Sequence, residues 1–469
     1  MPACGGGSAE GDWPTANGDL AGTRAVSGSA LDADNVGSLR PRWRFRLTAK
    51  PSFSGIFAST PVSDDDTVYV QDLRSNVFAL DRETGAVRWS RRVNARNDGP
   101  NGLAVADGVV YGATDSDAFA LRASDGTLQW TRHLTSFEEQ FVNVAPVVWK
   151  GLVLISTVGY PAYGRGAIYG LDASSGAVRW KFVTIRDPWR FPREAGGGGL
   201  WNPVSVDDDG HVYGGNSNPA PWGGTRERPN GASFPGPALY TDSLLVVDGR
   251  DGKLLWHDQV TPHDVRDYDF QATPVLGEGG LVFGAGKAGR VIAWKRGTRK
   301  RVWETAVGLH RNDLGPLPPR RATICPGLLG GVETQMAYAD GRLFVPVVDL
   351  CAHGSATSYD DFDAVDPARG RGRLVALDAS TGKRLWEQRF GSPVFGCATV
   401  ASDIVFTSTY DGMVYALNAE NGGRLWSYRM RAGINACPAV VGDQLLVGAG
   451  APRGQGEAIV PELVAFARP

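Results

Sequence analysis

Two aspartates stand two residues apart in the segment HDVRDYDFQATPVL, residues 263–276. Side chains two positions apart in an extended segment point to the same side, so Asp267 and Asp269 would repel each other unless a cation lies between them. A carboxylate beside a cation is also suited to remove a proton from a hydroxyl group. The pair therefore indicates a cation-assisted proton-transfer site, with a solvated acidic turn as the alternative.

Other catalytic signatures are missing from the sequence. The six histidines show neither HExxH spacing nor a cluster with cysteines, and there is no CxxC or CxxCH. There is also no GxSxG, no GxxxxGK[ST] and no nicotinamide-type GxGxxG between a strand and a helix. These absences disfavour hydrolases, nucleotide-dependent enzymes, zinc ribbons and covalent haem attachment.

The charge balance disfavours a nucleic acid partner. The chain has 469 residues with 48 Lys and Arg against 50 Asp and Glu, and no run of like charges gathers along it. Such a sequence offers no electrostatic footprint for nucleic acid or for an anionic membrane surface. No stretch approaches the roughly 18–20 apolar residues of a transmembrane helix, so we expect a soluble body that binds a small molecule or a protein.

A repeated unit that ends in tryptophan must position these residues. VYVQDLRSNVFALDRETGAVRW ends at Trp89, and MVYALNAENGGRLW ends at Trp426; both contain alternating apolar strands and a polar turn with glycine. Successive tryptophans lie 40–50 residues apart, except for two steps of 76 and 83 residues. This length fits four short antiparallel strands. The repeat tryptophans, which we expect to pack between units rather than bind ligands, are Trp43, Trp89, Trp130, Trp180, Trp256, Trp303, Trp386 and Trp426.

The two ends of the chain complete each other. The segment around Trp43 is a last strand without preceding strands, whereas INACPAVVGDQLLVGAG and PELVAFARP supply inner strands without a last one. The sequence therefore predicts an all-β fold: an eight-bladed β-propeller with four-stranded antiparallel blades, its ring closed by the N- and C-terminal strands.

The predicted domain organisation is simple. Residues 1–38 are an N-terminal tether and an extended lead-in segment, and residues 39–469 form a single propeller with insertions at about 186–242 and 308–373. Loops of this length usually cover or line a site, and tolerated ornament is the alternative.

From DWPTANGDLAGTR near the start to the last repeat, the chain resembles the quinoprotein alcohol and glucose dehydrogenase family. Members of that family are eight-bladed propellers that bind pyrroloquinoline quinone (PQQ) and a divalent or trivalent cation on the central axis. The same superfamily contains non-catalytic members, such as the outer-membrane assembly propeller lipoprotein. The resemblance thus implies a PQQ-dependent dehydrogenase or, alternatively, a catalytically silent propeller that binds a protein or a carbohydrate.

Four motifs, in family order, imply the site residues. By HDVRDYDF, Asp267 is similar to the general base and cation ligand, and Asp269 to an extra lanthanide ligand of some relatives. GGGGLWNP places Trp201 under the quinone ring, and GNSNPAPW matches Asn218 with an amide that reaches the cation. GAGKAGRVIAW places Lys287 at the quinone oxygens. An ordinary Asn-Pro turn and a solvated lysine are the alternatives for the last two motifs.

The chain departs from the family at three places. Pro161 stands at the position of the family's glutamate ligand, four residues before Arg165. No vicinal cysteines cap the quinone, and Arg266 stands where many relatives have tryptophan. Loss of one charged ligand is expected to weaken binding of calcium unless Asp269 substitutes, so the cation is either Ca²⁺ or a lanthanide ion.

The cysteines indicate an extracytoplasmic protein, periplasmic or in the cell envelope. Cys4 resembles the junction of a bacterial lipoprotein, which would give a lipid anchor, and an idle cysteine is the alternative. Cys397 and Cys437 occupy equivalent places in neighbouring repeats, so a disulfide is plausible there, with Cys325–Cys351 as the second bridge. Other pairings and free thiols remain open.

The dehydrogenase interpretation implies an alcohol or a sugar as the small-molecule substrate. Because the chain has no haem motif, electrons would pass to a separate acceptor, a cytochrome or a membrane quinone. Glu333, in GGVETQ, begins an inner strand and is expected to face the channel, but the sequence assigns it no task.

Overall fold

The computed structural model describes residues 11–52, 54–136, 140–159, 164–185, 196–231, 238–453 and 459–469. These residues are strands, turns and connections, with 3-10 turns in place of α-helices, so the prediction of an all-β propeller fold is confirmed. The 3-10 turns are η1 (Val36–Ser38), η2 (Pro229–Gly231), η3 (Glu278–Gly280), η4 (Phe362–Ala364) and η5 (Pro367–Arg369). None of the described helices is long and apolar enough to cross a membrane.

The first half of the chain forms four antiparallel sheets in sequence order. Each contains four strands that run back and forth, and β11 (Gln140–Phe141) extends the third sheet. The strands are β3 (Val62–Asp64), β4 (Thr67–Gln71), β5 (Val77–Asp81), β6 (Val87–Arg91); β7 (Ala104–Ala106), β8 (Val109–Ala113), β9 (Asp117–Arg122), β10 (Leu128–His133); β12 (Val147–Trp149), β13 (Leu152–Gly159), β14 (Ala167–Asp172), β15 (Val178–Val183); and β17 (Ser205–Val206), β18 (His211–Gly215), β20 (Ser243–Asp248), β21 (Leu254–Gln259).

The second half adds four more sheets of the same kind. The last of them combines β2, from near the start of the chain, with three strands from its end. The strands are β22 (Val275–Gly277), β23 (Leu281–Gly284), β24 (Arg290–Lys295), β25 (Lys300–Ala306); β27 (Ala337–Ala339), β28 (Arg342–Asp349), β31 (Arg371–Asp378), β32 (Arg384–Phe390); β33 (Ala398–Ala401), β34 (Ile404–Ser408), β35 (Met413–Asn418), β36 (Arg424–Arg429); and β37 (Ala439–Val441), β38 (Gln444–Ala449), β39 (Glu462–Ala467), β2 (Arg40–Arg46).

The repeat tryptophans join neighbouring sheets. The indole N–H of Trp89 donates to the backbone oxygen of Ala123 (2.7 Å), and that of Trp130 donates to Ala173 (2.8 Å), in each case in the turn of the following sheet. A side chain on the turn glycine Gly126 would lie 2.6 Å from the Trp89 ring, so only glycine allows this contact. Trp89 and Trp130 therefore pack between sheets, as predicted.

An N-terminal strap, residues 11–26, crosses the innermost strands. Its carbonyl groups accept hydrogen bonds from inner-strand residues of seven sheets, and its last part is β1 (Ala25–Val26), which pairs in parallel with β33. The inner-strand donors are Ser63, Val105, Val206, Leu276, Tyr338, Val400, Ser402 and Gly442. The strap thus ties together strands that are far apart in the sequence, and the lead-in predicted before residue 38 is packed from Gly11 onward.

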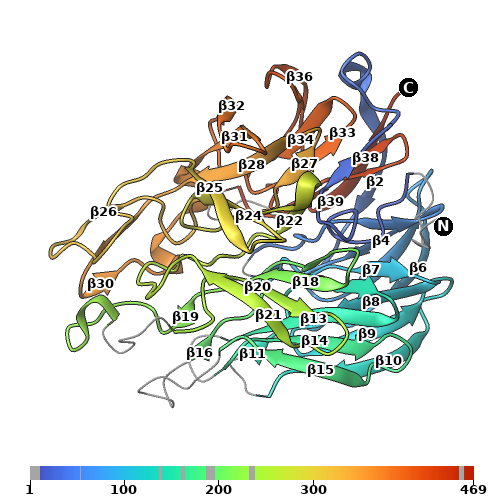
Figure 1. The fold of residues 1–469 in the computed structure, drawn as a ribbon. Coiled ribbons are helices and arrows are strands. Elements are labelled where there is room, and N and C mark those ends of the chain that lie inside the picture. Colours follow the sequence, from blue (N-terminus) through green and yellow to red (C-terminus); the bar gives the residue numbers. More distant parts are fainter. Residues whose placement is uncertain are drawn as a thin grey trace.

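Small sheets in the two insertions lie on one side of the molecule. They occupy the left of Figure 1, away from the labelled N and C ends. Their strands are β16 (Gly196–Gly197) with β19 (Pro219–Ala220), and β26 (Ala322–Ile324) with β29 (Ala352–Ser355) and β30 (Ser358–Tyr359). Described parts of both insertions therefore lie on the same side of the molecule.

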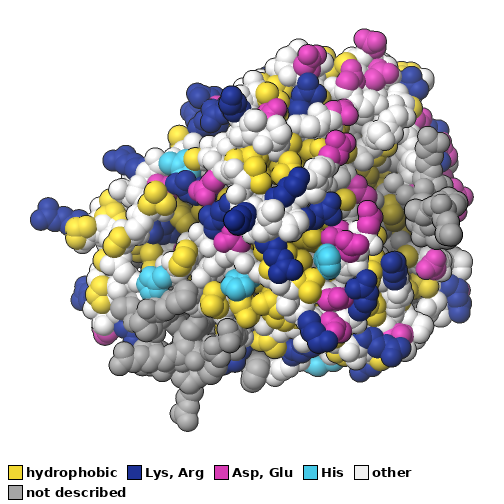
Figure 2. All heavy atoms as spheres, viewed as in Figure 1, with side chains coloured by type: hydrophobic (Ala, Val, Ile, Leu, Met, Phe, Trp, Pro, Cys, Tyr) yellow, Lys and Arg dark blue, Asp and Glu magenta, His cyan; other side chains and the backbone are white. Residues whose placement is uncertain are grey.

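Both expected disulfides are present. Cys325 pairs with Cys351 inside the second insertion, with a Cα–Cα distance of 4.5 Å, and Cys397 pairs with Cys437 across two neighbouring sheets, with a Cα–Cα distance of 5.1 Å. Cys4, the predicted anchor residue, lies outside the described residues. The face in Figure 2 intersperses basic and acidic side chains, in keeping with the mixed charge of the sequence.

Candidate active site

Four of the predicted residues meet in one buried cluster. Lys287, between β23 and β24, places its Nζ 2.6 Å from Asp267 Oδ2 and 2.7 Å from Asp269 Oδ2. Asn218, beside β19, donates its side-chain N–H to Asp267 Oδ1 (2.6 Å) and its backbone N–H to Asp269 Oδ1 (2.9 Å). Each of these residues is at most 6% exposed. The fold therefore brings together carboxylates, an ammonium and an amide from three separate segments.

Close backbone contact brings the lysine turn onto the aspartate segment. The backbone N–H of Lys287 donates to the backbone oxygen of Asp269 (3.0 Å). A Cβ on Gly286 would lie only 2.0 Å from that same oxygen, so glycine is required at this approach. Asp267 has a φ of 64°, a left-handed conformation that costs free energy in a non-glycine residue. The surrounding contacts therefore hold the predicted base in a strained conformation.

Trp201 follows a glycine segment that runs alongside Asn218. Gly198 donates its backbone N–H to the oxygen of Asn218, and Ser217 donates to the oxygen of Gly199 (both 2.9 Å). The buried indole Nε1 of Trp201 has no hydrogen-bond partner among the described residues. The indole therefore offers an unpaired donor at the site margin, although within the described chain no hydrogen bond links Trp201 to the aspartate cluster.

Several polar groups to which the sequence assigned no task lie around the cluster. Gln271 donates to Glu333 Oε2 (2.6 Å), whereas Glu333 Oε1, expected to face the channel, is buried without a hydrogen-bond partner in the described chain. Asp264 accepts the backbone N–H groups of Arg266 (2.8 Å) and Tyr268 (2.6 Å), and so fixes the loop that carries Asp267. No pattern in the sequence marks Gln271 or Asp264, because their contacts depend on how separate loops meet.

Burial and mutual repulsion shift the acids of the cluster toward their protonated forms. Burial raises the pKa of Asp267 to about 8; Lys287 opposes this shift and Asp269 adds to it. Burial likewise raises the pKa of Glu333 to about 7 and that of Asp264 to about 6. Burial alone would lower the pKa of Lys287, but Asp267 and Asp269 outweigh it and raise that pKa.

The cluster contains more carboxylates than cationic groups. Lys287 is one cation, and Arg266 is the other, but its guanidinium Nε donates to the backbone oxygen of Asn312 (3.1 Å) in the second insertion. Five carboxylates against two cations leave three negative charges uncompensated when all groups are ionised. The carboxylates, which influence one another electrostatically, are Asp242, Asp264, Asp267, Asp269 and Glu333.

This donor set fits a hard cation. Carboxylate and amide oxygens are the ligands that such ions prefer, and Asp267, Asp269 and Asn218 bring them within one hydrogen-bonded cluster. The surplus of buried acids is what an added cation would neutralise. The unpaired Trp201 Nε1 and Glu333 Oε1 similarly fit a polar organic molecule beside the cluster. The residues present are thus compatible with both a cation and a quinone.

The second insertion packs over the lysine. The ring of Phe362, in η4, has its centroid 5.7 Å from Lys287 Nζ. The Tyr268 hydroxyl donates to the backbone oxygen of Pro326 (2.8 Å), next to the disulfide-bonded Cys325. Aromatic cover of this kind limits water around an ammonium and strengthens its interaction with carboxylates.

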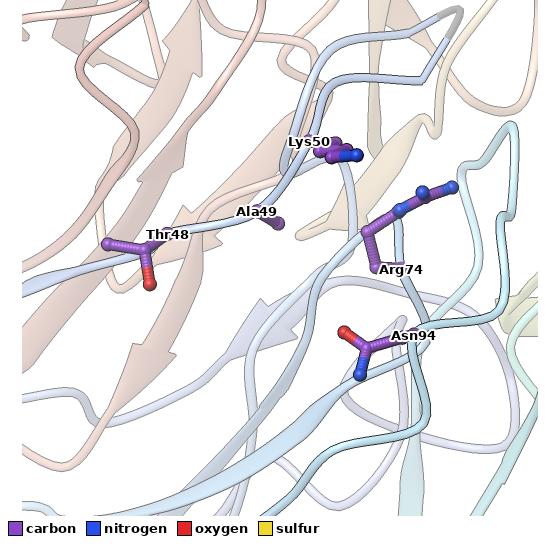
Figure 3. A pocket seen from close by; sticks show the side chains of 5 residues that line it. All are labelled: Thr48, Ala49, Lys50, Arg74 and Asn94. Atoms are coloured by element: carbon purple, nitrogen blue, oxygen red, sulfur yellow. The ribbon is translucent and has the colours of Figure 1, made fainter.

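A surface hollow of about 550 Å³ lies elsewhere, over the loops around the first sheet (Figure 3). None of the predicted site residues contributes to it. Its lining residues are Thr48, Ala49, Lys50, Arg74 and Asn94. The chemistry of the chain is therefore concentrated in the buried cluster and not in this hollow.

Two family models match the chain. One, described as outer membrane protein assembly factor BamB, matches residues 26–190 and 311–462. The other, the glucose/ethanol/alcohol dehydrogenase β-propeller domain, matches residues 123–306. The chain belongs to the propeller family of the first model, which matches more than half of it, and is similar to quinoprotein alcohol dehydrogenases. All four clustered residues, Asn218, Asp267, Asp269 and Lys287, lie within the part matched by the dehydrogenase model.

Similar dehydrogenases cover different shares of the chain. This chain is 28% identical over 481 residues to the quinohemoprotein alcohol dehydrogenase of Comamonas testosteroni. The aligned region covers 86% of this chain and 66% of the relative. This chain is 32% identical over 296 residues to quinohemoprotein alcohol dehydrogenase ADH IIB of Pseudomonas putida. That aligned region covers 56% of this chain and 41% of the relative. The chain therefore spans less than two thirds of the length of these two relatives.

A relative with another cation and a solved structure extend the comparison. The lanthanide-dependent methanol dehydrogenase of Methylacidiphilum fumariolicum (strain SolV) is 24% identical over 490 residues, covering 86% of this chain and 78% of the relative. The crystal structure of the Comamonas testosteroni quinohemoprotein alcohol dehydrogenase superposes with a TM-score of 0.84 at 23% identity, over 98% of this chain and 81% of that one. The structural likeness supports the propeller fold.

Pro161, at the position of the family's glutamate ligand, lies outside the described residues. The residues that the sequence assigned to the cation, Asn218, Asp267 and Asp269, all lie inside the described cluster. Their roles as ligands, and those of Trp201 and Lys287 toward a quinone, remain predictions.

Proposed function

We propose that this chain is a PQQ-dependent dehydrogenase that oxidises an alcohol or a sugar. The observation that carries the proposal is the position of Asp267: a buried carboxylate, held by Asn218 and Lys287, in a cluster with uncompensated negative charge. Similarity to quinoprotein alcohol dehydrogenases gives this arrangement its chemical context.

In the proposed reaction, Asp267 removes the hydroxyl proton of the substrate. A base is useful for this step when its pKa lies near the working pH, and burial places the pKa of Asp267 at about 8. Asn218 fixes the direction of the Asp267 carboxylate, and Asp269 helps to position Lys287. When bound, PQQ would accept the hydride and the cation would polarise the quinone carbonyl.

Separate residues would hold the two groups. Asn218, Asp267 and Asp269 would bind a Ca²⁺ or lanthanide ion, and Trp201 and Lys287 would contact PQQ. The name of the Methylacidiphilum relative records lanthanide dependence for that enzyme. The acidic surplus of this chain makes the same class of ion suitable here.

We further propose that the eight sheets are the blades of one closed ring. The pairing of β2 with β39, in register from Arg40 opposite Ala467 to Arg46 opposite Glu462, supports closure by the two ends of the chain. In Figure 1 the blue N-terminal strand β2 lies against the red C-terminal strands. The ring would comprise residues 39–469, with insertions at about 186–242 and 308–373.

The proposed cellular setting is extracytoplasmic. The two disulfides support an oxidising compartment, such as the periplasm or cell envelope. Cys4 is the proposed site of a lipid anchor. Electrons would leave the reduced quinone for a separate acceptor, a cytochrome or a membrane quinone.

Reconstitution tests the proposed function. The purified chain is loaded with PQQ and either Ca²⁺ or La³⁺, and dye reduction is followed with a panel of primary alcohols, secondary alcohols and sugars. We expect quinone binding, and turnover that Asp267→Asn lowers by about 10²- to 10⁴-fold. A matched control is Asp72→Asn, which alters a buried aspartate outside the cluster whose hydrogen-bond partners are Arg74 and Asn76. Quinone binding without turnover would contradict the dehydrogenase.

The second candidate is a catalytically silent propeller that binds a protein or a carbohydrate. The match of the BamB model to residues 26–190 and 311–462 favours it. Absence of both quinone binding and turnover after loading with each cation would support this candidate instead.

A further inference from the structure

Asp242 has an unusual environment for an acidic side chain. It lies immediately before β20, is 0% exposed, and neither carboxylate oxygen has a hydrogen-bond partner in the described residues. A buried carboxylate without partners is costly, because it has lost water and gained no replacement. Such a group either keeps a proton or serves a bound cation.

The backbone holds Asp242 next to the cluster. Its N–H donates to the backbone oxygen of Ser217 (2.9 Å), and its own oxygen accepts from Val260 (2.8 Å). Ser217 directly precedes Asn218, which in turn bonds both Asp267 and Asp269. The φ of Asp242 is 50°, a left-handed conformation that costs free energy for an aspartate. The backbone contacts on both sides of Asp242 therefore hold it in a conformation that is unfavourable by itself.

A second unpaired group lies beside it. The hydroxyl oxygen of Ser217 is also buried without a hydrogen-bond partner among the described residues. Three unpaired oxygens on adjoining segments are polar atoms that a cation, but not an apolar core, would satisfy.

The charged groups around Asp242 come from several elements. Its carboxyl group is repelled by Asp264, Asp269 and Asp267, in decreasing order, and attracted by Lys287. With Glu333 and Arg266 included, the ionised cluster carries three uncompensated negative charges. A trivalent cation would neutralise this charge, whereas a divalent cation would leave one carboxylate unbalanced.

We propose that Asp242 is a further carboxylate of the cation site and adapts that site to a trivalent ion of the lanthanide class. The inference rests on the proposed function, because it assumes that the acidic cluster binds a cation. Asp242 would also replace the charge that is missing at Pro161, the position of the family's glutamate ligand.

The test is a titration of the purified full chain, freed of metal by a chelator, with Tb³⁺ and separately with Ca²⁺. Tb³⁺ emission sensitised by tryptophan and calorimetry give the two affinities without any catalytic assay. We compare the unaltered chain with Asp242→Asn, which keeps the shape and removes the charge, and with Asp72→Asn as the matched control, a buried aspartate bonded to Arg74 and Asn76. We expect Asp242→Asn to weaken Tb³⁺ binding by about 10- to 100-fold and Ca²⁺ binding by less. Asp72→Asn should change neither affinity.

Three results would overturn the inference. Equal Tb³⁺ affinity in Asp242→Asn and the unaltered chain would show that Asp242 keeps its proton and takes no part; the proposed function would stand if PQQ-dependent turnover persisted. An equal fold-loss for Tb³⁺ and Ca²⁺ would remove the preference for a trivalent ion. Failure of the unaltered chain to bind either ion would remove the cation site altogether. If Asp242→Asn does not fold, Asp242→Ser, smaller and also neutral, is titrated in the same way.

Discussion

Two charged residues buried in the centre of the protein, Arg24 and Asp242, have opposite environments. Arg24, in the N-terminal strap, is 0% exposed and donates to five acceptors, among them the backbone oxygens of Ala398 (2.8 Å) and Ala16 (2.6 Å). Asp242 is equally buried but has no hydrogen-bond partner for either oxygen among the described residues. The fold itself supplies hydrogen-bond partners for the Arg24 guanidinium, whereas it supplies none for the Asp242 carboxylate among the described residues.

The contrast separates structural from functional burial. The fold satisfies Arg24 with acceptors that lie as much as 414 residues away in sequence, so its charge stabilises the contact between the strap and the inner strands. The acids around Asp267 repel one another instead, which costs stability in the empty site and favours binding of a cation. A buried charge therefore points to a ligand only when its partners are missing.

The largest expected effect comes from removing the proposed base in the acidic cluster. Asp267→Asn removes the proposed base while keeping its shape, so the turnover number of the reconstituted enzyme should fall by about 10²- to 10⁴-fold. Because a carboxylate that is costly to bury in its ionised form is lost as well, the metal-free variant should unfold at a higher temperature than the unaltered protein at pH 9. An unchanged turnover number would contradict the assignment of Asp267.

The next largest effect comes from removing the buried guanidinium of Arg24. Arg24→Met leaves five buried acceptors without their donor, so the free energy of unfolding measured in urea should fall by about 3–5 kcal/mol. Cation affinity of the protein that remains folded should be unchanged, because Arg24 is not part of the acidic cluster. A large loss of cation affinity at unchanged stability would contradict the distinction drawn here.

The dependence of stability on pH measures the cost of ionising the buried acids. Asp264, Glu333 and Asp267 have pKa values raised to about 6, 7 and 8 in the folded protein, so between pH 4 and 8 the folded state holds protons that the unfolded chain has released. Stability of the cation-free protein should therefore fall as pH rises through this window. We expect the unfolding temperature to drop by about 5 °C from pH 5 to pH 8. Saturating La³⁺ should remove most of that drop; a rise with pH in the cation-free protein would refute the sign.

The smallest expected effect removes only one acceptor of Arg24. Asn17 accepts from Arg24 through Oδ1 (3.2 Å) and donates to the hydroxyl of Thr273 (3.1 Å). Asn17→Ala should therefore lower the free energy of unfolding by about 1–2 kcal/mol, less than Arg24→Met. Urea denaturation of both variants under one condition gives the comparison, and an effect of Asn17→Ala as large as that of Arg24→Met would show that the arginine is not the centre of the network.

The sequence predicts the propeller well because its signal is local and repeated. Each tryptophan and turn glycine repeats at a fixed place within one unit, so packing of one sheet on the next can be inferred from spacing. The site is different. Asn218, Asp267 and Lys287 could be proposed only through resemblance to a family, since nothing in their spacing brings three loops together.

Arg24 and Asp242 had no detectable signal. Arg24 lies in an ordinary polar stretch, DLAGTR, and its acceptors Ala398 and Pro438 come from the other end of the chain. Asp242 lies in YTDS, where a turn aspartate exposed to water would be the natural expectation. Only the meeting of distant loops decides whether such a charge is satisfied.

The pairing of β2 with β39 has a consequence for biosynthesis. Arg44 and Glu462, which form an ion pair across these strands, are separated by 418 positions, so β2 leaves the ribosome long before its partner is translated. The early strand must wait with an unpaired edge, which is prone to join other chains. The sheet that contains β2 can therefore form only after β39 has been translated, and until then slow aggregation or chaperones must protect the edge of β2.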